Sequence, residues 1–122
     1  MSSPLCHFEF MTDDVNRCRK FYGGVFGWEF DDRSMPGYTL IQTGKEPGGG
    51  LMQRPQGVPR SSFMVYFMVD DIGGTLRKAT QTGGTVLKTE TPIPGVGAFA
   101  VFSDPDGNAI GVFKPSREAC AK

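Results

Sequence analysis

The chain has 122 residues, of which 39% are hydrophobic, and thirteen basic side chains balance thirteen acidic ones. This length predicts one domain, residues 1–122, with one continuous core. The balanced charge provides no field that would attract nucleic acid or anionic lipid. No basic cluster with interleaved aromatic residues appears, and no apolar run approaches the ~18 residues of a membrane span. We therefore expect neither a nucleic-acid-binding protein nor a membrane protein.

The cysteines indicate a reducing compartment. There are three, Cys6, Cys18 and Cys120, and none belongs to a CxxC pair. An odd count without such pairs argues against a disulfide framework. Residues 1–4 are too short and polar a stretch for a signal peptide. We therefore expect a cytoplasmic protein.

The first half predicts a strand, a helix and three further strands. Residues 6–11 alternate as in a strand, with His7, Glu9 and Met11 on one face. The pair at 13–14 offers a helix N-cap, apolar residues follow at helical spacing, and Gly27 should end the helix. Residues 28–30, 38–41 and 50–53 are short strand candidates separated by polar, glycine-containing turns.

The second half repeats this order. Residues 64–71 follow the register of residues 7–14, an offset of 57 residues (64 minus 7), and the same offset carries Val15 onto Ile72 and Gly27 onto Gly84. Strands at about 98–102 and 109–114 complete the half, and the segment 54–62, rich in proline and glycine, is a linker. The sequence therefore predicts an α+β fold of two tandem βαβββ modules, at about 5–55 and 62–115, with a concave surface between them for a small ligand.

Several segments resemble the vicinal-oxygen-chelate superfamily, which comprises glyoxalase I, bleomycin-resistance proteins and extradiol dioxygenases. The resemblance covers nearly the whole chain, and it implies paired modules that form a curved mixed sheet around a cleft, usually in a homodimer. The segments that carry it are HFEF at 7–10, CRKFY at 18–22, VFGW at 25–28, GGGLM at 48–52, YFMVDD at 66–71, TPIPGVG at 91–97 and SDPDGN at 103–108.

The resemblance also implies four metal-ligand positions, one on the first and one on the last strand of each module. They fall on His7, Met64, Gly111 and about Gly50, so only His7 matches. One imidazole cannot make a selective metal site, and His7 with Glu9 offers two donors for a weak one. We therefore expect no cofactor and no metal ligand set, with a divalent metal at His7 and Glu9 as the alternative.

Strand alternation then defines a mostly apolar pocket with a few polar groups. His7, Glu9 and Tyr66 are the candidate catalytic residues. The candidate substrate-binding residues are Gly50, Met52, Arg54, Met64, Met68, Gly111 and Phe113, with the glycines leaving room where ligands would otherwise stand. Methionine and aromatic side chains adapt to flat or aromatic molecules. His7 could equally be a hydrogen-bonded core residue, and Glu9 either a buried, paired carboxylate or a half-exposed one at the rim.

Four functions remain open at this level. The first is a metal-free protein that binds a small, mostly apolar or aromatic molecule, and the second is a metal-dependent lyase, isomerase or dioxygenase that uses His7 with non-standard ligands. A metal-free proton-transfer enzyme and a protein that serves as a structural or regulatory partner are the others. Two turns allow more than one interpretation. Residues 92–97 form either a lid or a plain hairpin, and we expect the hairpin. Residues 104–107 look like a fragment of a calcium loop but lack the rest of it, so we expect a type I turn.

Overall fold

A computed structural model describes residues 2–58 and 63–116. The chain divides into two compact units, Cys6–Met64 and the described parts of Met1–Leu5 with Val65–Lys122. We call them the first and the second module and describe each by itself. The division lies close to the expected boundary, and residues 2–5 belong with the second module, where the Pro4 carbonyl accepts a hydrogen bond from the Met68 amide at 2.9 Å.

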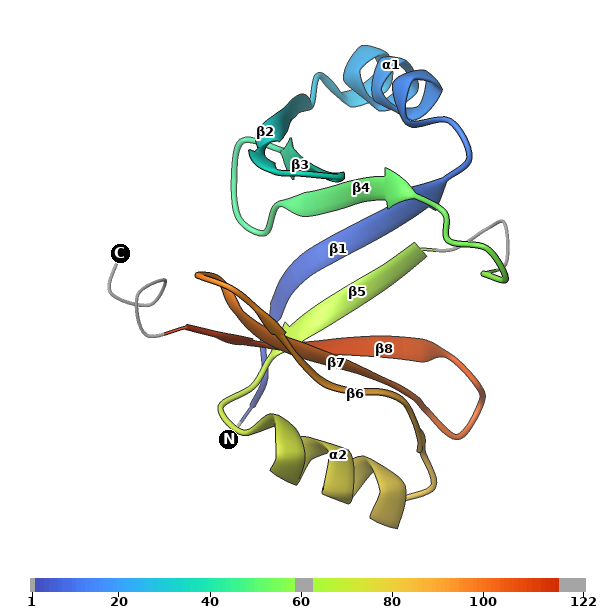
Figure 1. Ribbon diagram of the computed structural model, residues 1–122, viewed down its shortest axis with the longest axis vertical. Helices are drawn as coiled ribbons and strands as arrows, with labels where there is room; N and C mark the ends of the chain where they lie inside the picture. Colours follow the sequence, from blue (N-terminus) through green and yellow to red (C-terminus); the bar gives the residue numbers. More distant parts are fainter. Residues whose placement is uncertain (1, 59–62, 117–122) are drawn as a thin grey trace. The chain divides into compact units, whose positions relative to one another are not determined.

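The first module has the predicted βαβββ order (Figure 1). Strand β1 (Leu5–Thr12) leads into helix α1 (Val15–Phe26), and β2 (Glu29–Met35), β3 (Tyr38–Gln42) and β4 (Gly49–Gln53) follow. The strands lie in the order β2-β3-β4-β1. β1 and β4 are parallel, whereas the other neighbours are antiparallel. Strand β2 runs five residues beyond the predicted segment 28–30.

The second module repeats this arrangement. Strand β5 (Phe63–Met68) leads into helix α2 (Ile72–Gln81), and β6 (Thr85–Ile93), β7 (Gly97–Ser103) and β8 (Ala109–Pro115) follow. The strand order β5-β8-β7-β6 matches that of the first module, with β5 parallel to β8. The duplicated α+β fold is therefore confirmed. Neither helix in the described part of the chain has the length and apolar character that a membrane crossing requires.

The helix starts agree with the sequence, but the second helix end does not. Asp14 and Asp71 cap α1 and α2 through their carboxylates, each accepting from a backbone amide at 3.1 Å. Gly27 ends α1 in the left-handed conformation, at a φ of 70°. Gly84, which the offset of 57 matches to Gly27, does not take the same place, because α2 ends at Gln81 and the positive φ of 104° falls on Gly83.

Both open turns form ordinary connections. β6 and β7 pair up to Ile93 and Gly97, and the Val96 amide donates to the Ile93 carbonyl at 2.9 Å, so this segment forms a hairpin turn, and a role as a lid stays a prediction. The turn before β8 is held by the Asp104 carboxylate, which accepts from the amides of Asp106 and Asn108. These hydrogen bonds, with that of the Asn108 side-chain amide as the largest contribution, lower the pKa of Asp104.

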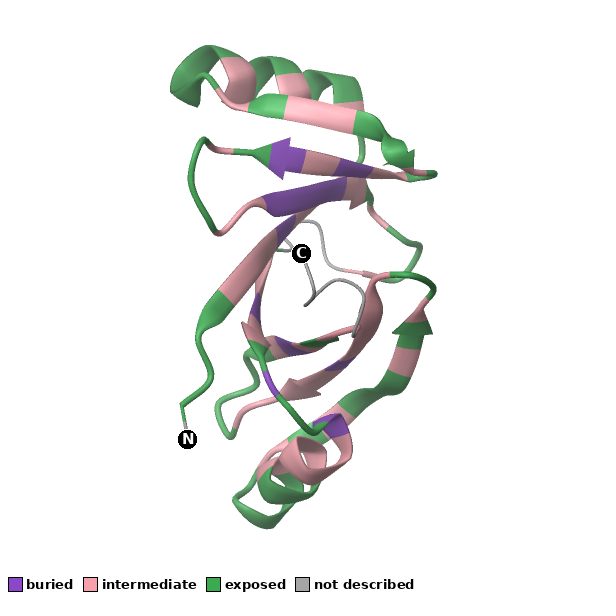
Figure 2. Cartoon of the chain, turned by 90° about the vertical axis from the view of Figure 1, so that its left-hand side faces the viewer, coloured by how far each residue is buried: buried purple, intermediate pink, exposed green. Residues whose placement is uncertain are grey.

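Each module buries its own set of apolar side chains, and Figure 2 shows these stretches along the strands. In the first module, Ile41 and Leu51 are at most 2% exposed. Aromatic rings surround them on the same side of the sheet: Phe8, Phe10, Tyr22 and Trp28 have neighbouring centroids between 4.8 and 6.5 Å apart. In the second module the core consists of Val69, Ile72, Ala100 and Val112.

Candidate functional site

The sheet of the first module has a helix side and an opposite, open side. Phe10, which pairs with Leu51, stacks on Tyr22 of α1 and so lies on the helix side. Residues that alternate with these lie on the other side, because successive strand residues point to opposite faces. The backbone pairs Glu9–Gly50, Met11–Met52 and Leu40–Gly50 define this face. We call it the open face, and its members are His7, Glu9, Met11, Tyr38, Leu40, Gly50 and Met52.

Three polar side chains on the open face form a hydrogen-bonded row. The Tyr38 hydroxyl donates to Glu9 Oε1 at 2.9 Å and lies 2.8 Å from His7 Nε2. Glu9 is only 6% exposed, so the interpretation of a buried, paired carboxylate holds and the half-exposed one is wrong. We call this row the His7–Tyr38–Glu9 row.

The row exists because Gly50 has no side chain. In the strand order β3-β4-β1, Gly50 of β4 lies between Tyr38 and the residues of β1. A Cβ placed on Gly50 would overlap the Tyr38 hydroxyl and the adjoining ring atoms. Tyr38 therefore reaches across the middle strand above Gly50. The expectation of open space directly above this glycine is wrong, since the tyrosine fills it.

The second module shows a related arrangement at Gly111. Gly111 pairs with Tyr66, and Phe113 with Met68, which places the predicted residues of β5 and β8 on one face. A Cβ on Gly111 would overlap the Tyr66 ring, and Tyr66 is 8% exposed. Gly50 and Gly111 are thus equivalent in the repeat, because they pair with residues 57 positions apart (66 minus 9). The expected space above Gly111 is filled as well.

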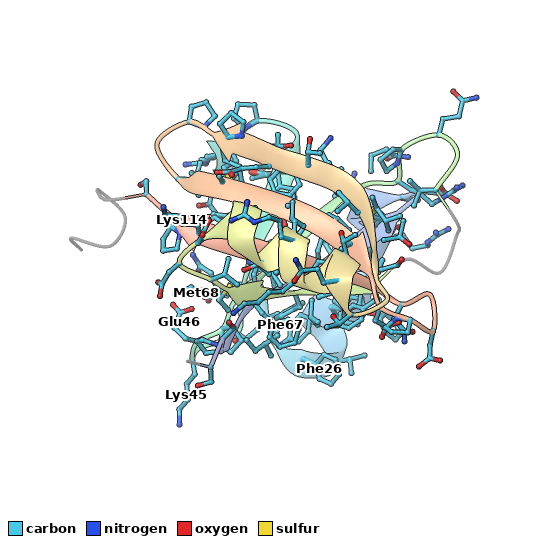
Figure 3. The ribbon with its side chains drawn as sticks, turned by 90° about the horizontal axis from the view of Figure 1, so that it is seen from below. Phe26, Lys45, Glu46, Phe67, Met68 and Lys114 are labelled. Carbon is cyan, nitrogen blue, oxygen red and sulfur yellow. The ribbon has the colours of Figure 1, made fainter. Side chains whose placement is uncertain are left out.

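His7 is held as a neutral imidazole near pH 7. Burial lowers the pKa of His7, and the carboxylate of Glu46 opposes this shift. Glu46 lies beside Lys45 in the loop between β3 and β4, both labelled in Figure 3. This loop encloses a hollow of about 360 Å³ lined by residues 41–46 and Gly48. A neutral imidazole has one donor and one acceptor nitrogen, so it can continue a hydrogen-bonded row.

Arg54, predicted to bind substrate, is engaged in structural contacts. Its Nε donates to Asp13 Oδ1 at 2.8 Å, and its Nη1 donates to the Val58 carbonyl. Its backbone amide also bonds the Thr12 carbonyl at 2.7 Å. These contacts fasten the segment after β4 to the start of α1. Binding roles for Met64 and Met68 remain predictions, as does the expected hollow between the modules.

The donor set does not fit a metal centre of the family's kind. Among the described residues, no group of three or more His, Cys, Asp or Glu side chains could hold an ion. His7 and Glu9 supply two donors, and both already bond Tyr38. Met64, Gly50 and Gly111 supply no oxygen or imidazole, which divalent metals of this type require.

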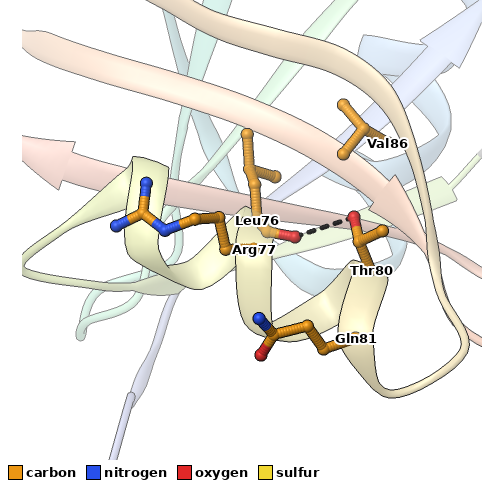
Figure 4. A pocket seen from close by; sticks show the side chains of 5 residues that line it. All are labelled: Leu76, Arg77, Thr80, Gln81 and Val86. Carbon is orange, nitrogen blue, oxygen red and sulfur yellow. Dashed lines mark hydrogen bonds between the residues drawn. The ribbon is translucent and has the colours of Figure 1, made fainter.

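A second hollow, of about 330 Å³, lies against α2 and β6 and was not predicted (Figure 4). Its lining consists of Leu76, Arg77, Thr80, Gln81 and Val86. The Thr80 hydroxyl donates to the Leu76 carbonyl at 3.0 Å, so this group serves the helix itself. In contrast to the open face, the residues that line this hollow do not include a hydrogen-bonded row of buried polar side chains.

Sequence reasoning identified His7 and Glu9 but missed Tyr38. The available signal was the alternation of residues 38–41, which puts Tyr38 and Leu40 on one face, together with the need of a buried Glu9 for a donor. Tyr38 is 29 residues from Glu9 in the chain, so the pairing depended on the strand order.

Two curated relatives resemble the chain. A Mycobacterium tuberculosis protein that bears the name of a glyoxylase, CFP32, is 38% identical over 112 residues, which cover 88% of this chain and 42% of the relative. The anthracycline biosynthesis protein DnrV of Streptomyces peucetius is 28% identical over 124 residues, covering 88% of this chain and 45% of the relative. The chain thus spans less than half the length of either protein.

Solved structures share the fold. A hypothetical protein from Bacillus halodurans superimposes with a TM-score of 0.73 at 14% identity, covering 98% of this chain and 99% of that one. The Mn(II)-bound glyoxalase of Novosphingobium aromaticivorans gives a TM-score of 0.66 at 18% identity, covering 97% and 40%. A family model matches residues 5–112. With its duplicated βαβββ modules, the chain therefore belongs to the glyoxalase/bleomycin resistance protein/dioxygenase superfamily.

Proposed function

We propose that the chain binds a small, mainly apolar or aromatic molecule on the open face of the first module, without a resident metal. The observation that carries this proposal is the His7–Tyr38–Glu9 row. A buried carboxylate is costly in free energy, and a sheet face that needed only to pack would not require one. A polar row beside apolar groups is the usual composition of a small-molecule site, because the polar groups orient a ligand that the apolar groups desolvate.

The neighbours of the row supply the apolar part. Met11, Leu40 and Met52 share the open face with it and are partly exposed. Methionine adapts to flat ring systems. The relative DnrV is named for anthracycline biosynthesis, and anthracyclines contain fused aromatic rings. Both observations support an aromatic ligand.

The alternative is a metal-dependent lyase or dioxygenase that uses His7 with non-standard ligands, and the Mn(II)-bound glyoxalase among the structural neighbours keeps it worth testing. His7 and Glu9 are the two possible metal ligands on the open face, and a selective site needs more than two, which favours the metal-free proposal. Elemental analysis of protein purified without chelator decides between them. A stoichiometric metal that is lost in His7→Ala would refute the metal-free proposal.

Ligand binding itself is tested by a thermal-shift screen of aromatic compounds. A ligand at a hundred times its Kd should stabilise the fold by ~2.7 kcal/mol. Tyr38→Phe should weaken a true hit, because it removes the hydroxyl that joins His7 and Glu9. Tyr22→Phe is the matched control, since Tyr22 stacks on Phe10 at 4.8 Å, on the helix side. No hit in a broad library, or equal loss in both variants, would count against this site.

The proposal also includes a cytoplasmic homodimer. The cysteine pattern supports the reducing compartment. Phe21, Val25 and Phe26 of α1 are each more than half exposed, and large exposed apolar groups of this kind favour association. Light scattering after gel filtration should give a dimer mass that Phe21→Ser with Phe26→Ser reduces to a monomer mass. A monomeric parent protein would refute the dimer.

A further inference from the structure

We propose that the hollow between α2 and β6 of the second module is a further binding site, and that it takes a small amphipathic anion, a carboxylate with a short alkyl chain. The site is separate from the open face of the first module, so this proposal stands or falls independently of the proposed function. Three observations support it: the apolar walls of the hollow, the position of Arg77 at one end, and an irregularity of β6 beside it.

The hollow is small and its walls are mainly apolar. Its volume of about 330 Å³ lies at the lower end of the range for small-molecule sites, about 300–1,000 Å³. Leu76 of α2 and Val86 of β6 form the apolar part, and both are half-buried. The hydrogen of the Thr80 hydroxyl is used within the helix, because it is donated to the Leu76 carbonyl. The hollow can therefore desolvate an alkyl chain, while Thr80 offers no donor to a ligand.

Arg77 gives the hollow a positive end. It is the only charged residue among the five that line the hollow, and its guanidinium makes no ion pair or hydrogen bond within the described part of the chain. In Figure 4 the guanidinium points along α2 and away from Val86. Its nitrogens lie next to Gly73 and Gly74, which have no side chains to cover them. A guanidinium at the end of an apolar hollow is complementary to a carboxylate.

A neighbouring carboxylate is already engaged in the helix cap. Asp71 lies beside the same two glycines, and it accepts from the Gly74 amide at 3.1 Å. All ten residues of α2 are described, and none of them is acidic, whereas Arg77 and Lys78 are cationic. The surface of α2 next to the hollow therefore favours an anionic ligand over a neutral or cationic one.

Strand β6 is irregular directly beside the hollow. Val86 pairs with Phe102, whereas Lys88 pairs with Val101, so Leu87 is an extra residue in β6 at this point. Such a bulge bends a strand, and bulges are frequent at sheet edges and next to functional sites. β6 is also the last strand in the order β5-β8-β7-β6. The bulge and the edge position are both consistent with a site that a ligand enters from solvent.

Octanoate is the probe for this site, and octanol is the neutral compound with the same chain length. In an amide NMR titration of the nitrogen-labelled full chain, octanoate should shift the resonances of α2 and of the start of β6. It should bind about two- to fivefold more tightly than octanol, the value of one solvent-exposed ion pair. Shifts confined to the first module, or no shift in α2 at any octanoate concentration below micelle formation, would overturn the proposal.

Two substitutions on α2 test the role of Arg77. Arg77→Gln should abolish the preference for octanoate while octanol still binds. Lys78→Gln is the matched control, because it makes the same change of charge on the same helix at a residue that does not line the hollow. Equal losses in both variants would mean that octanoate responds to the general charge of the surface, which would overturn the assigned site.

Two substitutions on β6 test the apolar wall. Val86→Ala should weaken the binding of both compounds about three- to fivefold, the value of roughly one buried methyl group. Leu87→Ala is the control, because Leu87 is 57% exposed and does not line the hollow. Unchanged affinities in Val86→Ala would count against the hollow as the place of the alkyl chain. The wild-type shifts and the wild-type affinity ratio keep the proposal falsifiable even where Val86→Ala fails to fold.

Discussion

Substituting Gly50 by alanine should destabilise the first module through Tyr38. The new Cβ would overlap the Tyr38 hydroxyl, so the ring must move away from both His7 and Glu9. The neutral contact is worth about 0.5–1.5 kcal/mol, and the one to the carboxylate about 1.5–3 kcal/mol. Their sum predicts a loss of about 2–4.5 kcal/mol in the free energy of unfolding. The φ of Gly50 lies outside the left-handed region, so backbone strain contributes nothing.

Urea denaturation followed by fluorescence measures this loss. With a slope of about 1–2 kcal/mol per molar urea, the midpoint should fall by about 1–4.5 M. In a Tyr38→Ala background the same substitution should cost little, or stabilise by up to about 1 kcal/mol, because alanine restricts the unfolded chain. Gly24→Ala is the control, since a Cβ there meets nothing within 4 Å in helix α1.

A Gly50→Ala protein as stable as wild type would refute this reasoning. So would an equal loss in the Tyr38→Ala background, because the cost would then come from the strand backbone rather than from the tyrosine. Loss of binding of an aromatic hit in Gly50→Ala, without loss of stability, would mean that the His7–Tyr38–Glu9 row serves the ligand alone.

Three further predictions follow from burial and charge. Leu51 is 1% exposed, so Leu51→Ala should cost about 2–5 kcal/mol, visible as a lower Tm, and a change below 1 kcal/mol would contradict its place in the core. Gly111→Ala should cost about 1–3 kcal/mol in urea unfolding, because its Cβ would overlap the buried ring of Tyr66, and the cost should vanish with Tyr66→Ala. His7 has a pKa below its unfolded value, so more protons bind the unfolded chain. Its contribution to stability should be complete above pH ~6.5 and lost as the pH falls toward the folded pKa. Unfolding curves and a proton NMR titration of this single histidine check the last prediction, which an unshifted or raised pKa would contradict.

The local elements could be predicted from sequence because their signals are local. Asp14 and Asp71 are of a residue type typical of helix N-caps, and Gly27 is of the type typical of a helix end. Alternation placed His7, Glu9 and Met11 on one face, as the register with β4 confirms. The offset of 57 residues matches Gly27 to Gly84, but a sequence offset carries a residue type and not a backbone angle, and the positive φ falls on Gly83.

The candidate site could not be predicted from such local signals, because it joins residues from three strands. The sequence by itself determined the duplicated βαβββ order. Only the tertiary structure decided that Tyr38 fills the space above Gly50. Strand order and register arise from hydrogen bonds between segments distant in the chain, and no periodicity within one segment encodes them. Strand β4 has no side chain at Gly50, so Tyr38 of β3 reaches across it to the carboxylate of Glu9 on β1.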